Sequence, residues 1–236
     1  METYSVFSGA LNKMPQGKKL LVNTINQYSY CIAEKDSEFK AALQGSDVLL
    51  PDGIGVVGAV RLLTGKKIRK IAGADMHRYL LEELNKKGGK CFYLGSSDST
   101  LKKIVSRLSV EYPSVQEQTY SPPYKPHFTE EESVEMVTRI NRFNPDVVFV
   151  GMTAPKQEKW AYAHKEKINA KIICSIGAVF DFYSGTISRP GGVWINFGME
   201  WLGRLVKEPK RMWKRYLYYG PVFLWYLARS KAGFKV

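Results

Sequence analysis

The stretch PDVVFVGMTAPKQEKW, residues 145–160, decides the fold class of this chain. Its first half is a run of apolar, mostly β-branched residues, which predicts a buried strand over residues 146–150. The turn that follows contains Gly151 and Pro155, and proline is well tolerated in the first turn of a helix. We therefore expect a helix over residues 156–168. A buried strand that leads through a short turn into a helix is the repeating unit of parallel sheets.

The same unit recurs along the chain. Short apolar runs alternate with longer segments of helical period, which predicts the α/β fold class and a Rossmann-like sheet with flanking helices. Further strands are expected over residues 19–24, 47–50, 90–94 and 171–176, and further helices over residues 54–63, 75–87, 100–111 and 130–143. The segment YSPPYKPH, residues 120–127, contains three prolines and predicts a loop.

The sequence changes character after the RPGG segment at residues 189–192. We expect an α/β core over residues 1–192 and a C-terminal basic helical appendage over residues 193–236. Within the appendage, an amphipathic helix is expected over residues 193–206, and a second helix is expected to start at Pro209.

Positive charge is concentrated in the appendage. The 236 residues carry a net charge of +13, and residues 204–236 contain nine Lys or Arg against one acidic residue, so an anionic partner is expected: lipid headgroups, diphosphates or nucleic acid. The apolar centre, residues 216–228, has thirteen residues, whereas a membrane-spanning helix needs about twenty. We expect it to lie in the headgroup layer of an anionic membrane surface. The alternative is that its aromatic residues pack on the core and its bases form a solvated rim.

Composition favours a folded protein of a reducing compartment. Apolar residues make up 44% and charged residues 24% of the chain, both near the average of globular proteins. Cys31, Cys91 and Cys174 are far apart and form no Cys-x-x-Cys pair, so we interpret them as reduced core residues. The first residues contain no long apolar stretch of the kind found in a secretory signal, which predicts a cytoplasmic location.

Four turns that follow predicted strands contain polar residues or glycines: residues 22–26, 50–55, 151–160 and 175–181. Ligands of open α/β sheets bind beyond the carboxyl ends of the strands, so these turns are expected to line one site. In the second turn, Asp52 is either the N-cap of the next helix or a general base at the mouth of the site. Its position in the sequence does not separate these two roles.

The third turn has the features of an anion site. The first N–H groups of the following helix favour an anion, Lys156 adds a positive charge, and Gln157 has an amide that can hydrogen-bond a sugar or a base. The alternative is an ordinary turn with solvated Lys and Gln side chains. The chain has no Asp-x-Asp triplet and its three histidines are scattered, so no bound metal ion is expected. A diphosphate would then be neutralised by Lys, Arg and helix N-termini.

Taken together, these turns resemble those of the WecG/TagA/CpsF glycosyltransferases. The matching pieces follow one another over nearly the whole chain: NTIN at residues 23–26, LLPDGIGVV at 49–57, IAGADM at 71–76, FYLGSS at 92–97, PDVVFVGMTAPKQEKW at 145–160, GAVFDFYSG at 177–185 and MEWLGRLVKEPKRMWKRY at 199–216. The resemblance implies an inverting, metal-independent transfer of a sugar from a UDP donor to a polyprenyl-diphosphate-linked saccharide. It further implies that no cofactor takes part and that the protein is peripheral on the inner face of the cell membrane, in bacterial surface polysaccharide synthesis.

The resemblance also implies roles for individual residues. Asp52 matches the proposed catalytic base of the family, Thr24 lies in the sugar and acceptor pocket, and Gln157 belongs to the substrate-binding loop. The cations of the appendage that act on the diphosphate match Arg204, Arg211 and either Lys214 or Arg215. The other residues expected to bind the donor or the rest of the substrate are Asn26, Gly53, Gly95, Gly151, Pro155, Lys156, Glu158 and Asp181.

The resemblance leaves the donated sugar open. Members that use N-acetylmannosamine often have Asn-Pro-Glu after the first strand, whereas this chain has Asn26-Gln27-Tyr28-Ser29. N-Acetylmannosamine, its uronic acid and a hexose such as glucose are therefore all candidates. The alternative from another class is a basic nucleic-acid-binding protein, which would use the bases and aromatic residues of the appendage but would leave the strand-end turns without a role. An NAD-dependent oxidoreductase is disfavoured because no glycine fingerprint follows the first strand.

Overall fold

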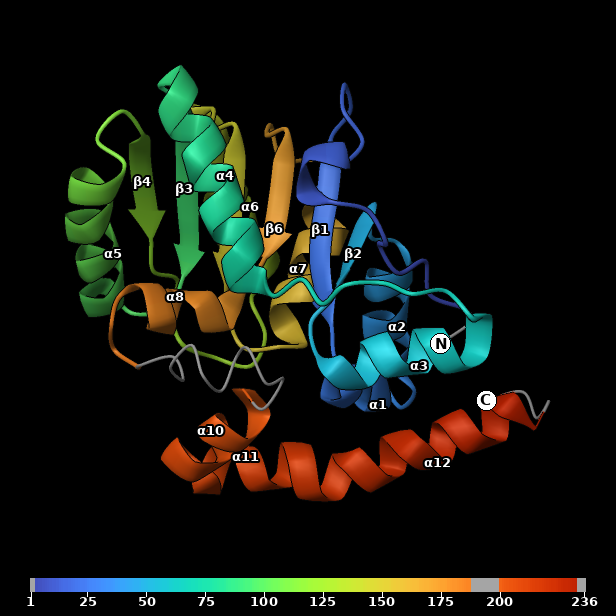
Figure 1. Cartoon of the computed structure of the whole chain (residues 1–236). Coiled ribbons are helices and arrows are strands. Elements are labelled where there is room, and N and C mark those ends of the chain that lie inside the picture. Colours follow the sequence, from blue (N-terminus) through green and yellow to red (C-terminus); the bar gives the residue numbers. More distant parts are fainter. Residues whose placement is uncertain (1–2, 188–199, 233–236) are drawn as a thin grey trace.

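The fold is built around one parallel sheet. A computed structural model of the chain describes residues 3–187 and 200–232, except for the side chains of Glu200, Arg204 and Arg211. Six strands lie in the order β2-β1-β6-β5-β3-β4, and every pair of neighbours is parallel (Figure 1). They are β1 (Leu20–Ile25), β2 (Val48–Pro51), β3 (Lys90–Gly95), β4 (Gln116–Tyr120), β5 (Val147–Gly151) and β6 (Ile172–Ser175). The predicted α/β class, with a Rossmann-like sheet and flanking helices, is confirmed.

The five predicted strands are present, but the sequence did not reveal β4. This strand, QEQTY, is polar and only partly buried, and it pairs with β3 at the edge of the sheet. An edge strand has a neighbour on one side only and needs no continuous apolar run, so hydrophobic patterning does not detect it.

Helices cover both faces of the sheet. The helices α4 (Gly73–Lys87), α5 (Asp98–Glu111) and α8 (Gly177–Tyr183) pack on one face, and α6 (Glu130–Phe143) and α7 (Lys156–His164) pack on the other. Side chains alternate between the faces, so that Val22 joins the first of these cores and its neighbour Leu21 joins the second. A third core lies around α1 (Gln27–Ala33), α2 (Ser37–Gln44) and α3 (Ile54–Thr64).

Several predicted helices differ from the observed ones. The helix predicted to end at residue 168 ends at His164, because the apolar Ile168 that extended the pattern is a buried residue of the following turn. The short helices α1, α2 and α8 and a 3-10 turn η1 (Leu11–Lys13) were not predicted. The helices α1, α2 and α8 have seven or eight residues, which is about two helical turns and too short for a clear periodic pattern.

The described part of the appendage is helical, as predicted. The helix α10 (Glu200–Lys207) ends before Glu208, and α11 (Pro209–Trp213) starts at the proline, which confirms the predicted interruption. A π-helical turn η2 (Lys214–Tyr218) then leads into α12 (Tyr219–Lys231). Residues 193–199, where the amphipathic helix was predicted to start, lie outside the described residues.

The helix α12 packs against the core along one face. In Figure 1 it lies beside α1 and α3, and its buried residues Tyr219, Phe223 and Leu227 belong to the same apolar cluster as Tyr30 of α1. The rings of Tyr30 and Phe223 meet edge to face at 5.4 Å. The opposite side of this helix keeps Leu224 and Trp225 exposed. No helix in the described ranges is long and apolar enough to cross a bilayer.

Candidate functional site

A cavity of about 1020 Å³ lies beyond the carboxyl ends of the strands. It is bordered by the turns that follow β1, β2, β3, β5 and β6, so the expectation that these turns share one site is confirmed. Ten of the predicted site residues line it: Thr24, Asn26, Asp52, Gly95, Gly151, Lys156, Gln157, Glu158, Asp181 and Arg215. The structure therefore brings most of the predicted residues together.

The remaining predicted residues lie elsewhere. Gly53 borders a smaller cavity of about 80 Å³ next to the large one, and Pro155 borders neither. Pro155 is the N-cap residue of α7. Arg204 lies on α10 and Arg211 lies on α11, and both side chains lie outside the described part of the chain.

Asp52 is held in place by the pairing of β1 and β2. Its N–H donates to the carbonyl of Ile25 at 2.9 Å, which continues the ladder of the two strands by one residue. The N-cap of α3 is Gly53, at a φ of 139° that side chains disfavour, and no side chain caps this helix. The N-cap alternative for Asp52 is therefore wrong, and its half-buried carboxyl borders the cavity.

Asp52 also lies where the two cavities meet. Asn26, Tyr28, Asp52 and Arg215 line both of them, whereas Lys70 and Trp201 line only the smaller one. The sequence did not single out Lys70 or Trp201. The only indication was that the first directly precedes the IAGADM turn and the second lies in the matching appendage segment.

Arg215 contributes a positive charge from the appendage to both cavities. Its guanidinium lies 4.7 Å from the centre of the Tyr28 ring and the residue is half-buried, while Lys214 is exposed and lines neither cavity. Of the two alternatives for the third cation, the structure favours Arg215.

Lys156 ties the start of α7 to the proline-rich loop. Its ammonium donates to the carbonyl of Lys125 at 2.7 Å and lies 4.4 Å from the centre of the Phe128 ring. Burial lowers the pKa of this ammonium. Residues 121–124 of the loop also line the cavity, so the predicted loop is part of the site, which the sequence did not indicate.

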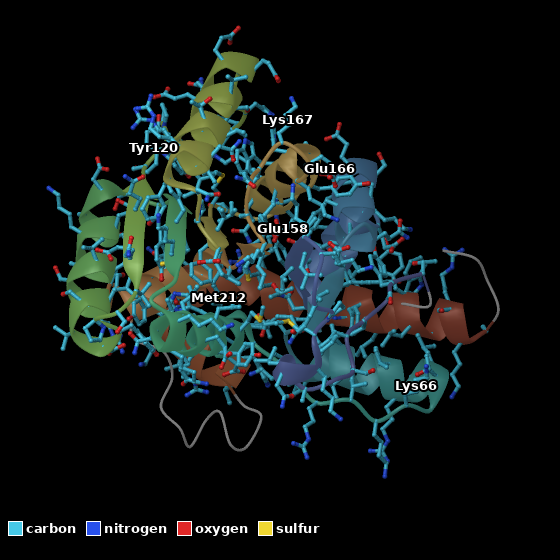
Figure 2. The ribbon with its side chains drawn as sticks, turned by 90° about the horizontal axis from the view of Figure 1, so that it is seen from above. Lys66, Tyr120, Glu158, Glu166, Lys167 and Met212 are labelled. Carbon is cyan, nitrogen blue, oxygen red and sulfur yellow. The ribbon has the colours of Figure 1, made fainter. Side chains whose placement is uncertain are left out.

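The side chains of Asn26 and Gln157 form hydrogen bonds to backbone groups of the protein itself. The Asn26 oxygen accepts the N–H groups of Tyr28 and Ser29, both at 3.0 Å, and so caps α1. Gln157 is only 5% exposed, so the alternative of a solvated glutamine is wrong. Its neighbour Glu158 is 2% exposed, and burial raises the pKa of that carboxyl to about 7. In Figure 2 the buried Glu158 lies near the middle of the view and Lys66 lies near its edge.

Glycines pack the floor of the site at close quarters. A Cβ on Gly151 would overlap the ring of Phe180, and a Cβ on Gly95 would overlap the carbonyl of Gly151. Gly95 also has a φ of 113°, which only glycine adopts readily. Close packing therefore requires glycine at both of these positions, which were predicted to bind the substrate.

The described histidines and cysteines are structural or remote. His77 is buried, its ring nitrogen Nε2 lies 2.7 Å from the hydroxyl of Tyr93, and burial lowers its pKa to about 3. The three cysteines are buried and free, as expected, and burial raises the pKa of each thiol. Within residues 3–187 and 200–232, no group of three or more His, Cys, Asp or Glu could hold a metal ion.

A parallel sheet with a cavity at its carboxyl edge, bordered by Asp52 and by Arg215 of a helical appendage, is an arrangement typical of α/β enzymes. The chain belongs to the glycosyl transferase WecG/TagA/CpsF family, which it matches over residues 3–235. It is therefore a glycosyltransferase, and the hexosyltransferase activity expected from the resemblance is supported. The match includes the basic appendage that suggested a nucleic-acid-binding protein.

Two relatives from Bacillus carry the same name, N-acetylglucosaminyldiphosphoundecaprenol N-acetyl-beta-D-mannosaminyltransferase. The protein of Bacillus subtilis is 34% identical over 197 residues, which cover 84% of this chain and 75% of the relative. The protein of Bacillus spizizenii is 29% identical over 205 residues, which cover 86% of this chain and 77% of the relative.

Proposed function

We propose that this chain transfers a sugar from a UDP donor to a polyprenyl-diphosphate-linked saccharide, with inversion and without a metal ion. The observation that carries the proposal is the place of Asp52, which borders both the large cavity and the smaller one beside it. A donor sugar in the large cavity and an acceptor hydroxyl at the smaller one would meet at this carboxyl. The names of the two relatives support the acceptor class, because both describe transfer to a diphosphoundecaprenol-linked sugar.

In the proposed reaction Asp52 is the general base. Its carboxylate accepts the proton of the acceptor hydroxyl while the hydroxyl oxygen forms a bond to the anomeric carbon of the donor sugar. The bond from that carbon to the diphosphate oxygen breaks on the opposite side, so the configuration is inverted and UDP leaves. Asp52 then releases the proton to solvent.

Positive charge in the site would stabilise the leaving UDP. Arg215 borders both cavities, and the dipole of α7 favours an anion at its N-terminal end. Arg204 and Arg211 are proposed to join them from α10 and α11. Metal independence is supported by these cations and by a sequence without an Asp-x-Asp triplet. Lys156 is proposed to act indirectly, because its ammonium donates a hydrogen bond to the Lys125 carbonyl in the proline-rich loop.

The donor proposed for first trial is UDP-N-acetylmannosamine, since both relatives are named for transfer of this sugar. Because Gln27 and Tyr28 stand where members that use N-acetylmannosamine often have Pro and Glu, the uronic acid and glucose are kept as alternatives. This difference falls in the first turn of α1, directly beside the Asn26 that lines both cavities.

Contact with the inner face of the membrane is proposed through the outer face of the appendage. Trp213, Leu217, Leu224 and Trp225 are exposed there, and Arg229 and Lys231 add positive charge at the end of α12. Exposed aromatic and aliphatic residues flanked by bases suit the headgroup layer of an anionic membrane. This surface would hold the site close to a lipid-linked acceptor.

The test is a panel of UDP-sugars incubated with a synthetic lipid-diphosphate N-acetylglucosamine, with and without a chelator. Asp52→Asn is expected to reduce turnover by about 10²-fold or more while the Kd for UDP stays within about threefold of wild type. Glu135→Gln, an exposed change on α6, is the matched control and should remain fully active. Retained turnover in Asp52→Asn would refute the base assignment, and loss of turnover in chelator would refute metal independence.

A further inference from the structure

The side chain of Gln157 connects two turns at the floor of the large cavity. Its oxygen Oε1 accepts the N–H of Met152, in the turn after β5, at 3.2 Å, and the N–H of Gly177, at the start of α8, at 3.1 Å. Both partners are backbone N–H groups and can only donate, so the amide oxygen must face them. The amide nitrogen is therefore directed to the other side.

Glu158 lies on that other side. The Gln157 nitrogen Nε2 donates to the Glu158 oxygen Oε1 at 2.8 Å, and both residues are buried. All polar atoms of the Gln157 amide group thus face protein partners: two N–H donors on the oxygen and one carboxyl acceptor for the nitrogen. The second Glu158 oxygen is buried and has no hydrogen-bond partner among the described atoms, so this carboxyl lies close to the site and away from solvent.

The turns that Gln157 connects touch each other directly. A Cβ on Gly177 would overlap both the carbonyl of Met152 and the Gln157 oxygen. The separation of the two turns is therefore set by contact on one side and by the shared amide oxygen on the other. Both turns line the cavity proposed for the donor, through Met152, Thr153 and Ala154 from one and Ile176, Gly177 and Ala178 from the other.

From these contacts we infer that Gln157 and Glu158 are positioning residues that hold the two donor-binding turns at a fixed separation. The inference deepens the proposed function, because it assigns to Gln157 an action through the two turns in place of a direct contact with the sugar. Glu158 fixes the orientation of the amide and thereby which of its atoms meets the backbone. The ligand served by this arrangement is the sugar-diphosphate donor.

A reciprocal exchange of the two side chains tests the inference. In Gln157→Glu, an oxygen can still accept the two N–H groups, but the other oxygen faces the buried Glu158 carboxyl, and the two carboxyls either repel each other or must take up a proton to form a hydrogen bond. In the double variant Gln157→Glu/Glu158→Gln, the new amide at 158 donates to the new carboxylate at 157, which also accepts both N–H groups. The hydrogen-bond pattern is restored with the same net charge.

We expect Gln157→Glu to raise the donor KM at least about tenfold and to lower Tm by at least about 3 °C. The double variant should recover the donor KM to within about threefold of wild type and most of the loss in Tm. Gln116→Glu, an exposed change at the start of β4, is the control for added charge and should behave as wild type. A double variant that recovers Tm but not the donor KM would overturn the inference, since Gln157 would then contact the donor itself.

The Tm of each variant and its Kd for UDP are measured without turnover, so they separate the inference from the proposed function. If no UDP-sugar is used by the wild type but the exchange restores Tm and UDP affinity, the arrangement stands and the proposed reaction fails. If the wild type is active and the exchange restores none of the three quantities, the inference fails and the reaction stands.

Discussion

Gly177→Ala tests how tightly the floor of the site is packed. The new methyl group would overlap the Met152 carbonyl and the Gln157 side-chain oxygen. A backbone carbonyl cannot move aside without shifting its turn, so the cost is that of an overpacked core, about 1–3 kcal/mol. Displacing Gln157 also weakens its bond to the Gly177 N–H, which adds about 0.5–1.5 kcal/mol. We expect Gly177→Ala to lower the free energy of unfolding by roughly 1.5–4.5 kcal/mol.

Gly58→Ala is the matched control. Gly58 lies inside α3 and is exposed, and a Cβ there would meet nothing within 4 Å. Because glycine in a helix is less favourable than alanine, this change should raise the free energy of unfolding by about 0.5–1 kcal/mol. The same substitution is thus expected to have opposite signs at the two positions.

The assay for both variants is urea unfolding followed by tryptophan fluorescence, together with the donor KM. Gly177→Ala should unfold at lower urea with an unchanged slope of free energy on urea concentration, and its donor KM should rise. If the free energy of unfolding of Gly177→Ala lies within about 0.5 kcal/mol of the wild-type value and its donor KM is unchanged, the turns at Met152 and Gly177 are not closely packed and the reasoning is refuted.

Two further predictions concern buried charge and the appendage. Folded His77 has a pKa of about 3, below its ordinary value of 6.5, so between these values the unfolded chain binds a proton that the folded chain does not. The contribution of His77 to the free energy of unfolding is therefore complete above about pH 6.5, and it decreases by about 1.4 kcal/mol per pH unit below that value. Over the same range Glu158, with a pKa raised to about 7, takes up a proton in the folded chain and opposes this loss, so the loss is measured as the difference between wild type and His77→Gln in urea titrations from pH 7 to pH 5; an equal slope in the variant would contradict the assignment to His77. For the appendage, Leu224→Ser/Trp225→Ser should weaken binding to phosphatidylglycerol vesicles at least about fivefold, because both exposed side chains lose apolar area. Val110→Ser on α5 removes a similarly exposed apolar side chain at a distance and should bind as wild type; equal weakening there would argue against a specific surface.

The central strands were predictable because burial on both faces favours a run of apolar residues in each. The strands β1, β3, β5 and β6 each contain an apolar run, such as VVFV in β5, which can be recognised without knowing which strands pair with it. The strand β4 could not be found in this way, because its pairing with β3 depends on backbone groups that every sequence has. The same limit applies to α1 and α2, which follow the N-cap residues Asn26 and Asp36 for about two turns.

The place of the site was predictable from topology, but the partners of its side chains were not. The turns after parallel strands meet at one edge of a sheet, which was enough to bring Asp52 and the turn after β5 together. That Gln157 is used internally depends on Gly177, twenty residues further along the chain. The two roles considered for Asp52 were separated by the backbone of Gly53, which takes the N-cap position itself.

The two alternatives for the appendage use different faces of one helix and do not exclude each other. Tyr219, Phe223 and Leu227 recur at intervals of four and face the core, whereas Leu224 and Trp225 lie on the other side. A helix held to the core by the first stripe can present the second to a membrane without leaving its place. Arg215 lies one turn before Tyr219, so the packing of α12 on α1 also keeps this cation at the cavity. Weakening that packing, for example by Phe223→Ala, would therefore remove charge from the site as well as apolar contact from the core, and membrane binding need not change.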